Sequence, residues 1–129
     1  MAKVKSVHND VLDGALNILK NNATQISVCT GAGDVAPATY AEATSTNMLA
    51  IKSNLTGADI TVGDGTTGRT ATIAQFTGIE VLTTGTAEYL CLCDVDDRLL
   101  YVTTVTSQVL TDGNTLTVPA WSVNIADPV

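Results

Sequence analysis

From residue 24 onward the chain breaks into short segments in which apolar and polar residues alternate, and this pattern most restricts its fold. Alternation with period two is typical of strands, and Gly, Asp or Asn turn residues bound each segment. Strands are therefore expected over residues 25–29, 48–51, 59–62, 69–76, 79–82, 87–93, 99–105 and 115–125. Because they do not alternate with helices, a parallel sheet is not expected. The pattern predicts a mainly β chain, built as an antiparallel sandwich, jelly roll or barrel.

The N-terminal part has a different period. Its apolar residues are spaced by three and four, which predicts one amphipathic helix. They are Val7, Val11, Leu12, Ala15, Leu16, Ile18 and Leu19. We expect Ser6 or Asn9 to cap the start, Asn21 and Asn22 to end the helix, and Gly14 to mark a kink or a close neighbour. The stripe must pack on the chain's own sheet or on another molecule, and both remain open.

The segments together predict a single domain over residues 1–129, with an N-terminal arm and helix over 1–22 and a β-sandwich over 23–129. The last strand segment changes its pattern at Pro119, which cannot donate a hydrogen bond to a sheet. Leu116 and Val118 share one parity, whereas the apolar residues from Trp121 onward share the other. We therefore expect a bulge or an edge position at Pro119, with Trp121 in the core.

The segment 87–93 is apolar on both faces. Leu90 and Leu92 share one face, and Tyr89, Cys91 and Cys93 share the other. A strand of this kind must be covered on both sides. We expect the N-terminal helix or a partner subunit to supply the second cover, so the chain is predicted to self-associate.

Charge and cysteine content narrow the function. Six Lys and Arg residues against 13 Asp and Glu residues give a net charge of -7, which argues against nucleic-acid binding. No stretch approaches the ~20 apolar residues of a membrane span, and no secretory signal is recognised, so the chain is expected to fold in the compartment where it is made. An odd count of three cysteines, with Cys91 and Cys93 at an i, i+2 spacing that bridges poorly, predicts reduced, buried thiols. With His8 as the one histidine, a four-ligand zinc site is not expected, and neither a metal nor a cofactor is predicted.

Two motifs have a catalytic or metal-binding appearance. Residues 63–68 match G-x-G-x-x-G, but a strand sequence follows where the dinucleotide fingerprint needs a helix, so a turn is expected. Asp94, Asp96 and Asp97 resemble the start of a calcium loop, but Arg98 occupies a ligand position, so a solvated hairpin turn is expected instead. With no hydrolase pattern either, we expect no catalytic residues and no enzyme activity.

Half of the basic residues lie in the first twenty positions, beside the amphipathic stripe. This arrangement suggests an arm that docks onto an acidic or mixed surface, although a solvated terminus would show it too. Together with the two-faced strand, it gives a set of candidate interface residues. These are Lys3, Lys5, Val7, Val11, Tyr89, Cys91 and Cys93.

The residue runs 11–19, 26–30, 37–43, 99–102 and 116–121 resemble small proteins encoded beside the major capsid protein in tailed bacteriophages, the capsid cement or decoration proteins. The resemblance implies a β-sandwich of jelly-roll type that self-associates as a dimer or trimer. It implies binding to the major capsid protein on the outer surface of the virion, after assembly in the host cytoplasm, where it clamps neighbouring capsid subunits. It brings no catalytic residues. Two alternatives stay open: another virion component such as a tail or head-fibre protein, and a small carbohydrate-binding adhesion module.

Overall fold

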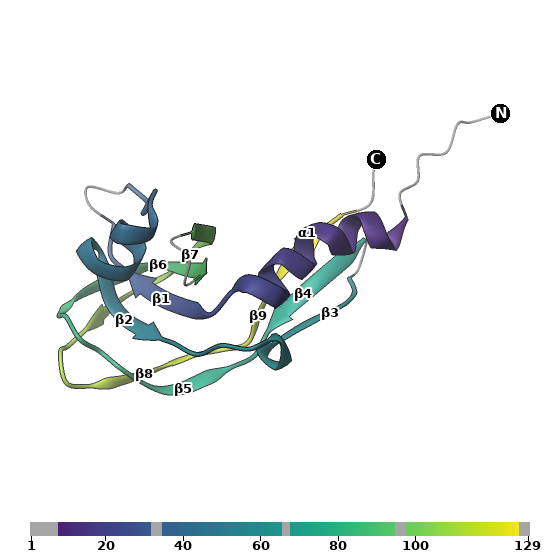
Figure 1. Cartoon of the computed structure of the whole chain (residues 1–129). Coiled ribbons are helices and arrows are strands. Elements are labelled where there is room, and N and C mark those ends of the chain that lie inside the picture. Colours follow the sequence, from purple (N-terminus) through teal and green to yellow (C-terminus); the bar gives the residue numbers. More distant parts are fainter. Residues whose placement is uncertain (1–7, 32–34, 66–67, 95–97, 127–129) are drawn as a thin grey trace.

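The structure is a computed structural model that describes residues 8–31, 35–65, 68–94 and 98–126. One α-helix of 14 residues precedes a series of strands, and two short helical turns interrupt them (Figure 1). The elements are α1 (Asn9–Asn22), β1 (Gln25–Cys29), the π-helical turn η1 (Glu42–Thr46), β2 (Met48–Lys52), the 3-10 turn η2 (Gly57–Asp59), β3 (Ile60–Asp64), β4 (Arg69–Ile73), β5 (Phe76–Glu80), β6 (Gly85–Asp94), β7 (Arg98–Leu110), β8 (Thr115–Val118) and β9 (Trp121–Ile125).

The strands form three ladders, and every pairing within them is antiparallel. The largest has the order β2-β1-β6-β7, a second has the order β3-β4-β9, and β5 pairs with β8. One core of buried aliphatic side chains joins all three ladders with α1. The prediction of a mainly β chain with antiparallel sheets and an N-terminal helix is confirmed.

Two segments predicted as single strands are each divided between two ladders. The segment 69–76 splits into β4, which pairs with β3, and the start of β5, which pairs with β8. The segment 115–125 splits at Pro119 into β8 and β9, which pair with β5 and β4 respectively. The expected change of parity at Pro119 is confirmed, because side chains on both sides of it pack against the same core. The break at Pro119 separates β8, which pairs with β5, from β9, which pairs with β4 in another ladder.

Helix α1 begins at Asn9, between the starts that a cap at Ser6 or at Asn9 would give. The Asp10 amide donates to Nδ1 of His8 at 3.1 Å, so His8 is the N-cap. Asn9 is the first helical residue and does not cap, and Ser6 lies outside the described residues. No atom approaches within 4 Å of a Cβ built on Gly14, so the close neighbour expected there is absent among the described residues.

The apolar stripe of α1 packs on the chain's own sheet. Leu12, Leu16 and Leu19 are buried, and the helix contacts β3 and β4. Arg69 at the start of β4 adds a polar tie, because its Nε lies 2.8 Å from Oδ1 of Asp13. The stripe was expected to pack on the chain's own sheet or on another molecule. Its buried leucines pack on the chain's own sheet.

The second face of β6 is covered by a segment that the sequence did not single out as a cover. Cys29, Cys91 and Cys93 are fully buried together with Ala43 of η1, and Tyr40 packs beside them. The expectation that α1 or a partner subunit covers this face was wrong. Small residues in η1 let the turn lie close to the sheet, whereas a sequence pattern gives no sign of such a local cover.

Candidate assembly surfaces

The predicted interface residues fall in three different environments. Lys3, Lys5 and Val7 lie outside the described residues. Val11 is 67% exposed on α1. Cys91 and Cys93 are 0% exposed beneath η1, and Tyr89 is half-buried against the same cluster. The two cysteines therefore present no surface to a partner. Because η1 covers this face of β6, the face no longer argues for self-association.

Helix α1 carries a second, narrower apolar line that faces solvent. Val11, Ala15 and Ile18 are spaced by four and three residues, and all three are exposed. We call this line the helix stripe. Ala15 and Ile18 of this stripe line a groove of about 390 Å³ between α1, the first half of β7 and β9. The other lining residues of this groove are Leu16, Leu19, Leu100, Tyr101, Val123, Asn124 and Ile125. The sequence predicted one broad stripe, and the structure divides it into a buried face and an exposed line.

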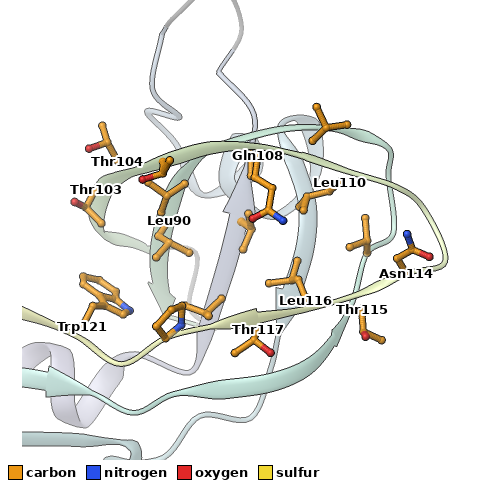
Figure 2. A pocket seen from close by; sticks show the side chains of 18 of the residues that line it. Leu90, Thr103, Thr104, Gln108, Leu110, Asn114, Thr115, Leu116, Thr117 and Trp121 are labelled. Atoms are coloured by element: carbon orange, nitrogen blue, oxygen red, sulfur yellow. The ribbon is translucent and has the colours of Figure 1, made fainter.

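A larger hollow of about 940 Å³ lies between the second half of β7 and β8, and we call it the β7–β8 groove. Figure 2 shows Gln108 on β7 and Leu116 on β8 pointing toward one another across it. Leu90 and Leu110 contribute apolar wall, and threonines and Asn114 line much of the rest. Within the described residues β7 pairs only with β6, and β8 only with β5. Two strand edges with free backbone groups therefore border the groove.

An irregularity in β7 shapes the groove. Ala87 pairs with Gln108 but Tyr89 pairs with Thr104, so residues 105–107 lie opposite the single residue Glu88. A bulge of this kind bends the strand and raises its local twist. It interrupts the regular row of hydrogen-bonding groups along the edge, which limits edge-to-edge aggregation.

Trp121 lies at the wall between the two grooves. Its ring stacks on Tyr101 with centroids 5.9 Å apart, and Trp121 lines the β7–β8 groove while Tyr101 lines the groove beside α1. The ring packs against the core, as predicted, yet it is only partly buried. Its Nε1 is buried and has no hydrogen-bond partner among the described residues. No sequence pattern indicates this groove-lining position, because it depends on how the ladders are set against each other.

The described basic side chains are largely engaged within the chain. Arg69 pairs with Asp13 and Asp64, and these two carboxylates raise the pKa of its guanidinium. Lys20 donates to the carbonyl oxygens of Gly57 and Ile60. The surface of the described part is therefore mainly acidic, and its cations do not gather into a patch suited to phosphate.

The two sequence motifs both connect antiparallel strands. In the first, Asp64 pairs with Arg69 and the Gly65 amide donates to the Gly68 carbonyl at 3.2 Å, so the turn prediction for 63–68 is confirmed. In the second, Asp94 is 4% exposed and ion-paired with Arg98, which corrects the expectation of a solvated turn at that residue. Asp96 and Asp97 lie outside the described residues. Among the described residues no group of three or more His, Cys, Asp or Glu side chains is arranged to hold a metal ion.

No family model, curated protein or solved structure matches this chain. In the described ranges, none of the helical segments has the length and apolar character needed to cross a membrane. Function is therefore inferred from the surfaces of the chain itself and from the sequence resemblance.

Proposed function

We propose that this chain is a structural virion protein, a capsid cement protein that binds the outer face of an icosahedral phage head and clamps neighbouring major capsid subunits. A clamp holds two molecules at once, so it needs two separate contact surfaces. The start of α1, which carries Val11, and the connection between β7 and β8 lie toward opposite ends of an elongated molecule (Figure 1), although the grooves beside them meet at Trp121. This separation is the observation that supports bridging best. The proposal includes a jelly-roll arrangement of the sandwich.

Both surfaces have a composition suited to protein contacts. Val11 and Ile18 are 67% and 48% exposed on the helix stripe, and Val109 is 72% exposed beside the β7–β8 groove. Covering such side chains contributes roughly 25 cal/mol per Å² of apolar surface removed from water. At the groove, the free edges of β7 and β8 would pair with an extended segment of a capsid subunit.

The charge distribution favours the outer side of a shell. The net charge of -7 makes the DNA-lined interior an unfavourable environment. Lys3 and Lys5 precede α1 in the sequence, and in this proposal they contribute to binding an acidic capsid surface. No catalytic group takes part in this function.

Co-sedimentation with empty capsid shells that lack the protein tests the proposal. We expect Val11→Asp and Val109→Asp each to weaken binding to shells by tenfold or more, because each places a charge in a desolvated contact. Thr72→Asp is the matched control, since Thr72 is exposed on β4 at the parity opposite to the buried Ala71 and Ile73. Failure of the unmodified chain to bind shells would refute the proposal. Binding that Val11→Asp and Val109→Asp leave unchanged would refute the two-surface clamp.

Deletion of residues 1–6 tests the basic arm separately. We expect the truncated chain to keep its melting temperature and to bind shells more weakly, because α1 begins at Asn9. Undiminished binding would show that the arm does not dock. Self-association is part of the same proposal, and light scattering that shows a stable 13.3 kDa monomer at micromolar concentration would contradict it.

A carbohydrate-binding adhesion module is the second candidate, and the β7–β8 groove is the observation that favours it. The groove offers the Trp121 ring and the polar side chains of Gln108 and Asn114. Sugar sites combine an aromatic platform with a few converging polar groups. A glycan array separates the two candidates. A carbohydrate-binding module should bind particular glycans and lose this binding on Trp121→Ala substitution, whereas a cement protein should bind none.

A further inference from the structure

We propose that Cys29 and Cys91 are an oxidisable pair that closes to a disulfide between β1 and β6. Their Sγ atoms lie 3.9 Å apart, and both side chains are 0% exposed. Sequence spacing could not reveal the pair, because the two residues are 62 positions apart and only the strand register brings them together.

The register places both sulfurs on one face of the sheet. Ser27 pairs with Cys91 and Cys29 pairs with Tyr89, so the two cysteines are diagonal neighbours on adjacent strands. A disulfide needs its sulfurs about 2.05 Å apart and its Cα atoms within about 7 Å, and diagonal neighbours on adjacent strands have Cα atoms about 7–8 Å apart, at the edge of that limit. Closure therefore combines rotation about the Cα–Cβ bonds with a small approach of β1 and β6, starting from an Sγ–Sγ distance of 3.9 Å. Cys91 and Cys93, by contrast, are successive side chains on one face of a single strand.

The surroundings give the two thiols different roles. Hydrogen bonds from the Cys91 thiol and the Ser27 hydroxyl to the Cys29 sulfur lower the pKa of Cys29, against the opposing effect of burial. The same contact with Cys29, together with burial, raises the pKa of Cys91. Cys29 is therefore the thiol that ionises first and attacks, and Cys91 is the resolving thiol.

A low-molecular-weight disulfide such as oxidised glutathione balances the reaction. The Cys29 thiolate attacks one glutathione sulfur, forms a mixed disulfide and releases the first glutathione thiolate. Cys91 then loses its proton and attacks the Cys29 sulfur, which releases the second glutathione thiolate. The chain loses two electrons and two protons, and two molecules of reduced glutathione carry them away.

Access to the pair requires movement of the turn that covers it. The Cys29 thiol donates to the carbonyl oxygen of Ala43 in η1 at 3.3 Å, so η1 lies directly over the sulfur. Local opening of a short turn of this kind needs far less free energy than global unfolding. Oxidation is therefore expected to be slow and to proceed without global unfolding.

The consequence is a staple across the largest sheet. A bond between residues 62 positions apart restricts the unfolded chain strongly, and we expect the melting temperature to rise by about 10 °C. A cross-link of this type would suit a protein that is made in a reducing environment and later works outside it.

Cysteine mapping of the native chain tests the proposal. We expect incubation of the reduced chain with excess oxidised glutathione to lower its mass by about 2 Da. After denaturation, alkylation should then label one thiol instead of three. Peptide mapping should identify that thiol as Cys93, and dithiothreitol should restore all three.

Single variants provide the controls. Cys93→Ser should close the bridge as the unmodified chain does, whereas Cys29→Ser and Cys91→Ser should not, and Cys29→Ala and Cys91→Ala replace them if a buried hydroxyl prevents folding. Three alkylatable thiols after prolonged oxidation of the folded chain would overturn the proposal. A bridge that includes Cys93, or one that joins two chains, would overturn it equally.

Discussion

Truncating Leu16 to alanine tests whether α1 is an integral part of the core. Leu16 is 1% exposed and belongs to the cluster shared by all three ladders. Leu→Ala substitutions at such sites lose the transfer free energy of the removed carbons and leave a cavity, which together destabilise by roughly 3–5 kcal/mol. A chain of this length has an unfolding entropy of about 0.27 kcal/mol/K, so we expect the melting temperature to fall by roughly 11–18 °C.

The measurement is urea unfolding followed by circular dichroism, with a thermal scan as a second readout. Val11→Ala is the matched control, because it shortens an apolar side chain on the same helix at a position 67% exposed. We expect the control to change the free energy of unfolding by less than about 0.5 kcal/mol. If Leu16→Ala costs less than about 1 kcal/mol, or no more than the control, then α1 does not pack on the sheet as described.

Four further outcomes follow from particular residues. Gly14→Ala should stabilise the chain by about 0.5–1 kcal/mol in thermal unfolding, because a Cβ there meets no atom within 4 Å in a helix interior. Gly68→Ala should lower the melting temperature markedly, because its φ is +69° and the new Cβ would overlap the Ile125 carbonyl. Burial raises the pKa of Cys93 from 9.0 to about 11, so the unfolded state releases this proton first and stability should fall as the pH rises from 9 to 11. In urea titrations at these pH values, Cys93→Ala should lose less stability than the unmodified chain, and an equal loss would contradict this assignment. EDTA should leave the melting temperature unchanged, and a fall of several degrees would point to a bound metal ion.

Alternation and turn residues were sufficient to predict where strands occur, because each strand has one face on the core. The change of partner within 69–76 was missed although the buried apolar residues change parity between Ile73 and Phe76, because no proline or glycine marks the break there. At Pro119 a mark exists, because proline breaks the ladder and the apolar parity changes with it. The N-cap was missed for a related reason: His8 is a less common cap than serine or asparagine, and its Nδ1 does the work of a side-chain oxygen.

The candidate surfaces were less predictable than the fold. Val11, predicted as an interface residue, is exposed on α1, and its interface role stays a prediction. Cys91 and Cys93 were misassigned because the cover over them comes from η1, whose small and polar residues show no apolar periodicity. The β7–β8 groove and the contact between Cys29 and Cys91 depend on register and on the setting of one ladder against another. Neither quantity can be read from a single sequence.

The long β6–β7 hairpin has a consequence for how quickly the chain reaches its native state. Its two strands are close in sequence, so they can pair early, within microseconds for a hairpin in isolation. Strands β3 and β4 form a second local hairpin, whereas other pairings join distant segments: Ser27 of β1 pairs with Cys91 of β6, 64 positions away, and Ala71 of β4 pairs with Val123 of β9, 52 positions away. Loops of that size close slowly, and folding rates fall as the average separation of contacting residues rises. The hairpin therefore provides a template on which β1 is added, and the search by β1 and β9 for their partners sets the pace of folding.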